Sequence, residues 1–280
     1  ADKKAMKGAF VDPARIATLY GSKQEERRVV RAQDVPPLLV AALQAVEDRD
    51  FAHHHGIAPL AILRAAWVNL TAGEVVQGGS TLTQQLVRNL FLSRTQSLSR
   101  KANEATLALL IEARFSKARI LEAYLNEIYL GQQGGQAVHG VAAASEFYFG
   151  HDLQFADLPE IALLIGLIQG PSLYDPRRFP ERAKQRRDVV LKVLEETGLI
   201  NATDRAAAVR APLGVTSAGA LARNRYPAFL DLVREQLRRD FPDSTLRSEG
   251  LTILTTLAPA TQNYAEAAVT ERIAALGKAG

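Results

Sequence analysis

The chain has 280 residues, of which 47% are apolar and 23% are charged, a composition typical of a globular protein with a substantial core. It contains no cysteine, which excludes a disulfide scaffold, a cysteine nucleophile and a thiolate metal site. Lys and Arg outnumber Asp and Glu by 34 to 30, so the chain is only mildly basic. The longest apolar run, residues 161–168, is far shorter than the ~20 residues of a membrane-spanning helix.

The predicted elements are mostly helices, whose ends follow from capping residues and prolines. In chain order they cover Leu38–Val46, Leu60–Leu70, Thr81–Phe91 after Ser80, Arg100–Phe115 after Ser99, Lys117–Leu130 after Ser116, Pro180–Thr197, Pro227–Asp240 and Pro259–Leu276. Asp157 and Glu160 have the spacing of a capping box, which predicts one more helix. The β-branched segment Leu251–Leu257 predicts a strand.

These elements divide the chain into four predicted parts. Residues 1–33 form a connecting segment, residues 34–210 the main helical domain, and residues 211–250 a linker with a connecting helix. A single strand has no partner in an otherwise helical chain. Residues 251–280 are therefore expected to begin a further domain that this chain does not contain in full.

Positive charge is concentrated between residues 88 and 119, a segment that contains seven basic and two acidic residues. Arginine side chains suit phosphate or carboxylate ligands, but a solvated helix face would show the same composition. Aromatic residues make up only 6% of the chain, and no helix-turn-helix or zinc-finger pattern is present. Nucleic acid is therefore excluded as a partner.

Two segments have compositions that suggest chemistry. Residues 47–56 (EDRDFAHHHG) place carboxylates at the end of a predicted helix, where apolar surroundings would raise a pKa towards that of a general base. The three consecutive histidines do not share a helix face, which disfavours a metal site. Residues 78–89 (GGSTLTQQLVRN) place two glycines before a helix N-terminus. That pattern fits either an anion site or a capped helix with polar residues in solvent.

Four motifs in this order resemble glycosyltransferase family 51, the peptidoglycan glycosyltransferases of class A penicillin-binding proteins. The motifs are Glu47-Asp48-x-x-Phe51-x-x-His54-x-Gly56, the segment Gly78 to Gln85 with Arg88-Asn89, Arg100-Lys101-x-x-Glu104, and Ile120 to Tyr124-Leu-Asn126. The likeness covers roughly residues 34–200 and is greatest to the 1b type. It implies a mainly α, lysozyme-like domain over residues 34–210, followed by a short C-terminal strand and helix leading towards an absent transpeptidase domain.

The resemblance implies an enzyme that polymerises lipid II into β-1,4-linked glycan strands, with inversion and release of undecaprenyl pyrophosphate. Glu47 matches the general base, and Glu104 matches a second catalytic carboxylate. The alternative for Glu104 is an ion pair with Lys101 or Arg100 on one helix. The substrate-binding residues implied are Asp48, Phe51, His54, Ser80, Thr81, Gln84, Gln85, Arg88, Asn89, Arg100 and Lys101. Of these, His54 is expected mainly to brace the turn that follows Glu47.

Several partners follow from the same resemblance. They are lipid II and the growing strand, the membrane surface, moenomycin-type inhibitors, cell-wall synthesis proteins and a divalent cation, Mg²⁺ or Mn²⁺. Ile57–Leu70, which contains the single tryptophan, is apolar enough to lie at a membrane interface or to be a buried helix. The expected location is the periplasmic face of the bacterial inner membrane. His151 stands where many relatives carry a lysine, and Gln169 stands where some 1b-type relatives do.

The chain has no Ser-x-x-Lys and no Lys-Thr-Gly, the motifs of a transpeptidase. It is therefore expected to be a fragment of a bifunctional enzyme, without its transpeptidase and its membrane anchor. Two other functions remain open: a glycan hydrolase or lytic transglycosylase on the same scaffold, and a scaffold that binds lipid II without catalysis. The basic cluster argues against the first, and the presence of both Glu47 and Glu104 argues against the second.

Overall fold

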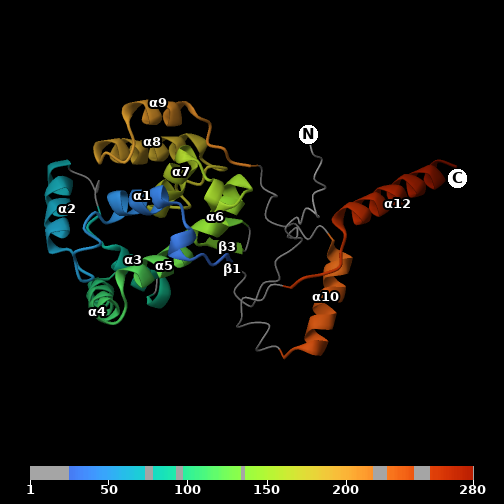
Figure 1. Cartoon of the computed structure of the whole chain (residues 1–280), viewed down its shortest axis with the longest axis horizontal. Helices are drawn as coiled ribbons and strands as arrows, with labels where there is room; N and C mark the ends of the chain where they lie inside the picture. Colours follow the sequence, from blue (N-terminus) through green and yellow to red (C-terminus); the bar gives the residue numbers. More distant parts are fainter. Residues whose placement is uncertain are drawn as a thin grey trace, which may run out of the picture. The chain divides into compact units, whose positions relative to one another are not determined.

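The computed structural model describes residues 25–72, 78–92, 97–133, 136–216, 226–242 and 253–279. These fall into two units, residues 25–216 and residues 226–279 (Figure 1). The larger unit contains β1 (Glu25–Arg27), η1 (Ala32–Asp34), α1 (Pro37–Glu47), α2 (Pro59–Ala72), α3 (Leu82–Phe91), α4 (Leu98–Arg114), α5 (Lys117–Glu127), β2 (Tyr129–Gln133), β3 (Gln136–His139), α6 (Val141–Phe149), η2 (Leu153–Phe155), α7 (Leu158–Ile168), α8 (Pro180–Glu196) and α9 (Ala202–Arg210). The expected mainly α fold is confirmed.

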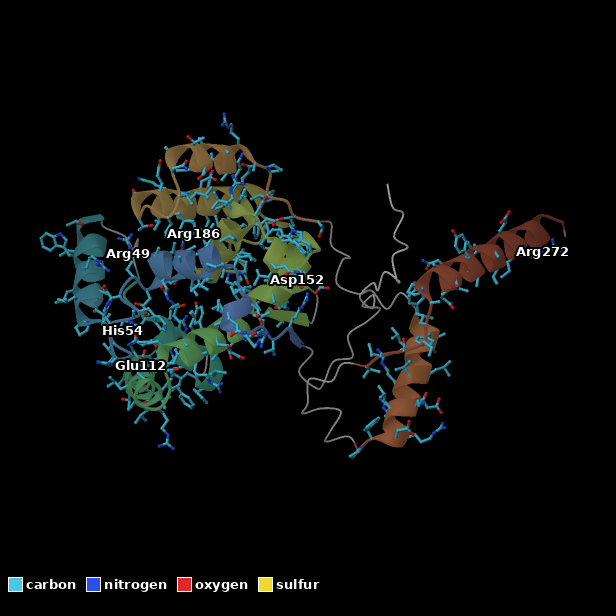
Figure 2. The ribbon with its side chains drawn as sticks, in the orientation of Figure 1. Arg49, His54, Glu112, Asp152, Arg186 and Arg272 are labelled. Atoms are coloured by element: carbon cyan, nitrogen blue, oxygen red, sulfur yellow. The ribbon has the colours of Figure 1, made fainter. Side chains whose placement is uncertain are left out.

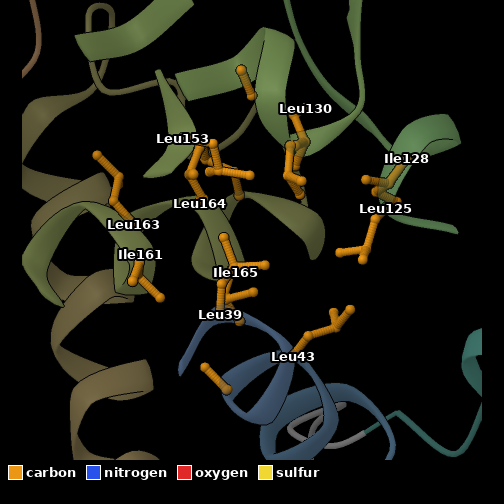
Figure 3. Packing of buried hydrophobic residues seen from close by; sticks show 14 of the residues in the cluster. Leu39, Leu43, Leu125, Ile128, Leu130, Leu153, Ile161, Leu163, Leu164 and Ile165 are labelled. Carbon is orange, nitrogen blue, oxygen red and sulfur yellow. The ribbon is translucent and has the colours of Figure 1, made fainter. Parts of the chain in front are cut away.

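Helix α7 lies at the centre of the larger unit. Every residue from Ile161 to Leu167 is buried, as expected for a helix that is apolar on all sides. Leu39 and Leu43 of α1 pack against it, and α6 and α8 cover further sides (Figure 3). Helices α3, α4 and α5 pack on one another, and α1 lies between them and α8 (Figure 1). The C-terminal end of α1 therefore meets both groups of helices.

A small sheet completes the unit, in the order β1-β3-β2, with β2 antiparallel and β1 parallel to β3. The predicted helix Lys117–Leu130 is therefore wrong beyond Glu127, because Tyr129–Gln133 forms a strand. Gly131 lies against the Tyr148 hydroxyl, where a Cβ would be only 2.3 Å from its oxygen. Asn126 closes this region by accepting from the Val30 N–H and donating to the Val30 carbonyl, each at 2.8 Å.

The predicted side-chain caps agree with the structure at two helix starts and differ from it at two others. Ser116 caps α5, and the capping box of Asp157 and Glu160 begins α7, as predicted. The N-cap of α3 is Thr81 instead of Ser80, and the N-cap of α4 is Ser97 instead of Ser99. In both corrected cases the side-chain oxygen accepts from the backbone N–H three residues on, which is what defines the cap.

The smaller unit contains α10 (Pro227–Asp240) and α12 (Pro259–Ala279), both beginning at the predicted proline. Tyr226 is buried and donates to Asn263 Oδ1 at 3.1 Å. The predicted strand Leu251–Leu257 is wrong over its described part, because residues 253–258 have no regular secondary structure. No strand lies beside them among the described residues of this unit to supply ladder hydrogen bonds. Residues 251 and 252 lie outside the described residues. No helix in the described parts of either unit is long and apolar enough to cross a membrane.

Candidate active site

Glu47 is the last residue of α1, and it is partly buried, with side chains of α3 and α8 around its carboxyl group. Burial raises the pKa of Glu47 above its ordinary value. The hydrogen bond from Gln85 Nε2 to Glu47 Oε2, at 2.9 Å, and the charges of Arg186 and Arg88 oppose that rise. A carboxyl group whose pKa is raised and which still has cations close by is suited to take up a proton.

The two arginines that act on Glu47 come from different helices. Arg88 lies in the last turn of α3, and its guanidinium group makes no hydrogen bond or ion pair with the described residues. Arg186 lies on α8, on the side that faces α1 (Figure 2), and its Nε is 3.5 Å from the Gly166 carbonyl oxygen. Burial lowers the pKa of Arg186 and Glu47 opposes this. The site therefore combines one carboxylate with two guanidinium groups, of which the sequence indicated only Arg88.

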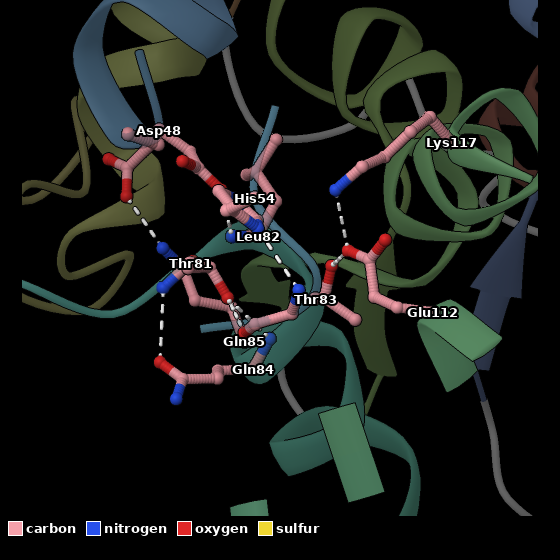
Figure 4. Close-up of polar contacts among 11 residues, drawn as sticks. Asp48, His54, Thr81, Leu82, Thr83, Gln84, Gln85, Glu112 and Lys117 are labelled. Carbon is pink, nitrogen blue, oxygen red and sulfur yellow. Dashed lines mark hydrogen bonds and ion pairs between the residues drawn. The ribbon is translucent and has the colours of Figure 1, made fainter. Parts of the chain in front are cut away.

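The N-terminus of α3 is held by the turn that follows Glu47 (Figure 4). Asp48 Oδ2 accepts from the Leu82 N–H at 2.9 Å and lies 2.8 Å from His54 Nε2. His54 Nδ1 accepts from the Gly56 N–H at 3.1 Å, so the ring hydrogen is on Nε2, directed at Asp48. The expectation that His54 braces this turn agrees with that geometry.

Thr81 and Gln84 form a capping box at the same helix end. Thr81 Oγ1 accepts from the Gln84 N–H at 3.2 Å, Gln84 Oε1 accepts from the Thr81 N–H at 3.2 Å, and Thr81 Oγ1 donates to the Gly56 carbonyl at 2.7 Å. Both side chains are only 2% exposed. These hydrogen bonds give both residues a structural role in holding the start of α3. Their contact with sugars or phosphates stays a prediction.

A second buried network fixes α3 from the opposite side (Figure 4). Glu112 Oε1 accepts from Thr83 Oγ1 at 2.6 Å and from Lys117 Nζ at 2.8 Å. Lys117 Nζ lies 4.5 Å from the centre of the Phe51 ring, which is itself buried. Phe51, predicted as a substrate contact, is thus part of the packing that positions α3.

Two motif glycines allow close backbone approach. Gly56 has φ +90°, and a Cβ there would lie 2.7 Å from the Ala108 carbonyl oxygen of α4. A Cβ on Gly79 would lie 2.9 Å from Ile62 Cα of α2. The absence of a side chain at Gly79 therefore serves helix packing, which differs from the anion contact considered from the sequence.

The third motif forms its own cluster on α4. Arg100 Nη1 bonds one oxygen of the buried Glu104, and Lys101 Nζ bonds the other at 2.9 Å. Lys101 Nζ also donates to Ser80 Oγ at 2.7 Å, which connects this cluster to the loop before α3. The alternative considered for Glu104, an ion pair on its own helix, is thus what the structure contains. Arg100 Nε is buried and has no partner within the described residues.

The predicted site residues therefore separate into three groups. Arg88 and Gln85 act directly on Glu47, and Ser80, Arg100, Lys101 and Glu104 form the α4 cluster. Asp48, Phe51, His54, Thr81 and Gln84 form the framework. Asn89 is exposed on α3, and its contact with substrate stays a prediction.

Sequence reasoning missed two residues, Arg186 and Tyr124. The Tyr124 hydroxyl donates to Gln85 Oε1 at 2.9 Å, next to the bond between Gln85 and Glu47. Tyr124 lies in the fourth motif, none of whose residues is among the predicted substrate contacts. The signal that could have found it is that a buried tyrosine needs a partner for its hydroxyl. Arg186 is one of several basic residues on α8, and no sequence signal distinguishes it from its neighbours.

Comparison with known proteins identifies the family. The family described as Transglycosylase matches residues 12–195, which is more than half of the chain. The chain belongs to the transglycosylase family, glycosyltransferase family 51. The resemblance expected from the four motifs is thereby confirmed.

The relatives of this transglycosylase chain include three proteins named penicillin-binding protein 1B. The protein from Vibrio cholerae is 46% identical over 268 residues, which cover 96% of this chain and 34% of the relative. The protein from Haemophilus influenzae is 45% identical and the one from Escherichia coli 44%, over 94% and 96% of this chain. The likeness to the 1b type is confirmed, and the chain spans about a third of the length of these relatives.

Proposed function

We propose that this transglycosylase chain polymerises lipid II into β-1,4-linked glycan strands at the periplasmic face of the inner membrane. The observation that carries the proposal is the environment of Glu47. Its pKa is raised by burial, while the charges of Arg88 and Arg186 lie within electrostatic reach of its carboxylate. A base placed beside two cations suits a reaction in which a hydroxyl attacks and a diphosphate leaves.

In the proposed reaction Glu47 takes the proton from the 4-hydroxyl of the acceptor GlcNAc. The hydroxyl oxygen attacks the anomeric carbon of the donor MurNAc from the face opposite the diphosphate. The bond from that carbon to the diphosphate oxygen breaks, and its electrons leave with undecaprenyl pyrophosphate. The anomeric configuration inverts, Glu47 ends protonated, and the guanidinium groups of Arg88 and Arg186 stabilise the negative charge on the departing group.

The α4 cluster suits a second anion contact. Arg100 and Lys101 share the single carboxylate of Glu104 in this structure, so the three side chains keep one net positive charge. Lys101 Nζ is also 2.7 Å from Ser80 Oγ. A phosphate would add acceptor oxygens to these two cations, of which Lys101 is the more exposed. Glu104 then acts by holding Arg100 and Lys101 in place. Besides lipid II, the proposed reaction requires the growing glycan strand as a second substrate.

A divalent cation, expected from the family resemblance, does not fit these side chains as a protein-held ion. Both oxygens of Glu104 are engaged by Arg100 and Lys101. No group of three His, Cys, Asp or Glu side chains that could hold a metal gathers in the described parts of the chain. We therefore derive no step through a metal ion.

A glycan hydrolase is the alternative function, and it requires a second carboxyl group beside the scissile bond. Asp48, next to Glu47 in sequence, is buried and holds Leu82 and His54. Glu104 is engaged by its two cations. Both carboxylates are thus committed to structural partners, which favours the transferase.

One assay separates these functions. The chain is incubated with labelled lipid II and, in parallel, with finished glycan strands. Polymer from lipid II is the expected product; cleaved glycan would support the hydrolase, and no product from either would leave only a binding scaffold. Glu47→Gln should abolish polymerisation, because an amide cannot accept the proton, whereas Glu181→Gln, at an exposed carboxylate in the first turn of α8, should retain it. Polymerisation by Glu47→Gln at the normal rate would remove Glu47 as the base.

A further inference from the structure

A chain of two hydrogen bonds connects three helices behind the candidate base. The Tyr124 hydroxyl of α5 donates to Gln85 Oε1 of α3 at 2.9 Å, and Gln85 Nε2 donates to Glu47 Oε2 of α1 at 2.9 Å. Tyr124 is 1% exposed and Gln85 is 7% exposed. Neither side chain is therefore free to turn towards solvent.

The direction of the hydrogen bond between Tyr124 and Gln85 determines which end of the Gln85 amide faces Glu47. A carboxamide has one end that accepts and one end that donates. Burial raises the pKa of Tyr124 well above its ordinary value, so the phenol keeps its hydrogen and donates it. Because Tyr124 occupies the carbonyl end of Gln85, the amide must present its NH₂ group to Glu47. That group stabilises an ionised carboxylate and offers no acceptor to a protonated one.

We propose that Tyr124 and Gln85 are positioning residues that keep Glu47 ionised and hold its free oxygen in one direction before proton transfer. This inference rests on the proposed function, in which Glu47 is the general base. Without the Tyr124 hydroxyl the Gln85 amide is free to turn over, and a carbonyl oxygen beside Glu47 would favour the protonated, inactive form.

The other charged groups around Glu47 come from three helices. Asp48 follows it at the end of α1, Arg88 faces it from α3, and Arg186 faces it from α8. The two arginines lower the pKa of Glu47 and Asp48 raises it. Replacing Tyr124 by Phe leaves all three in place and removes a single hydroxyl. We call the two hydrogen bonds from Tyr124 through Gln85 to Glu47 the relay. A change in the titration of Glu47 in this variant then reports the loss of the relay.

The experiment compares the wild-type chain with Tyr124→Phe and with Tyr148→Phe. Tyr148 is the matched control, because its hydroxyl is also buried and donates to the Leu130 carbonyl at 2.9 Å, outside the relay. Two quantities are measured: the ¹³C NMR titration of the Glu47 carboxyl, assigned with Glu47→Gln, and the pH dependence of lipid II polymerisation. Tyr124→Phe should move the titration and the acidic limb of the rate profile upward by about one pH unit. Tyr148→Phe should lower stability to a similar extent and move neither.

A double-mutant cycle tests whether Tyr124 acts through Gln85. In a Gln85→Met background, Tyr124→Phe should produce no further shift in the Glu47 titration, because the group that it orients is gone. An unchanged titration in Tyr124→Phe would overturn the inference. A shift of the same size in the Gln85→Met background would overturn it too, because Tyr124 would then act without Gln85.

Failure of this inference can be told apart from failure of the proposed function. Polymerisation by Glu47→Gln would reject the base, and the NMR titration, which needs no activity, would still decide the relay. If Glu47→Gln is inactive but the Glu47 titration is unchanged in Tyr124→Phe, only the relay is rejected and the proposed function stands. If Tyr124→Phe does not fold, the side-chain amide signals of Gln85 in the wild-type chain decide: they should titrate together with Glu47, and signals independent of pH would reject the relay.

Discussion

At the scale of single residues, Glu47 meets two opposing demands. Burial makes its charged form less favourable, while Gln85, Arg186 and Arg88 make it more favourable, and the net effect is a raised pKa. The native state therefore holds the Glu47 proton more tightly than the unfolded chain does. By linkage, the stability associated with this group is present below the pKa of the unfolded chain and is lost as the pH rises through the pKa of the folded protein.

Glu47→Gln should accordingly stabilise the fold while it removes activity. At about pH 7.5 the free energy of unfolding should increase by about 1 kcal/mol, because the cost of a buried charge is gone, and the gain should vanish near pH 4. Urea unfolding of the wild type and the variant at both pH values measures this. The exposed Glu181→Gln serves as the control, and a loss of stability in Glu47→Gln at the higher pH would contradict the prediction.

At the scale of elements, helix α3 is the part that the site depends on. It carries Gln85 and Arg88, and its N-terminus is held by Thr81 and Asp48. Thr83 fixes the next turn through Glu112 and Lys117. Most hydrogen-bonding groups of the polar residues before and within α3 thus bond to other parts of the protein and fix the helix in place. The guanidinium group of Arg88 stays available for a ligand.

Thr81→Ala tests this placement, with Ser116→Ala, the N-cap of α5, as the matched control. Both variants lose a cap, which costs about 1 kcal/mol. Thr81→Ala also loses the bond to the Gly56 carbonyl and should cost about 2 kcal/mol in total. Thermal unfolding measures stability, and lipid II polymerisation should fall further in Thr81→Ala than in Ser116→Ala. Equal effects of the two variants on both quantities would contradict the role assigned to Thr81.

At the scale of the whole molecule, the buried apolar cluster lies within one unit. Its members run from Val35 to Ala208, and the partly buried residues packed against them run from Val30 to Val215. Buried Arg187 closes the end of this unit by donating to the Ala211 carbonyl at 2.8 Å and to the Val209 carbonyl at 2.9 Å. None of these contacts involves residues 226–279.

A chain that ends after residue 225 should therefore fold cooperatively and retain the activity proposed for the longer chain. Its melting temperature for the transglycosylase unit should change by only a few degrees, because no residue of the buried cluster of that unit is removed. Calorimetry and the lipid II assay measure the two properties. Loss of the cooperative transition on truncation would show that the core depends on residues beyond 225.

The sequence by itself determined the helical class, most helix ends and the family. Those properties depend on capping residues, prolines and short motifs, which act over a few positions along the chain. The same local rules missed the sheet, although Gly134-Gly135 between the two strands is a hairpin signal. They also placed the cap of α3 at Ser80, one residue before Thr81.

Only the tertiary structure decided which charges and hydroxyls reach Glu47. Arg186 acts on Glu47 because α8 packs against α1. Tyr124 acts on it only through Gln85, which it reaches because α5 packs against α3. The structure also divided one basic stretch into Arg88, which acts on Glu47, and the α4 cluster, in which Arg100 and Lys101 pair with Glu104. Proximity between distant segments depends on how the helices pack, and neither composition nor motif spacing contains that information.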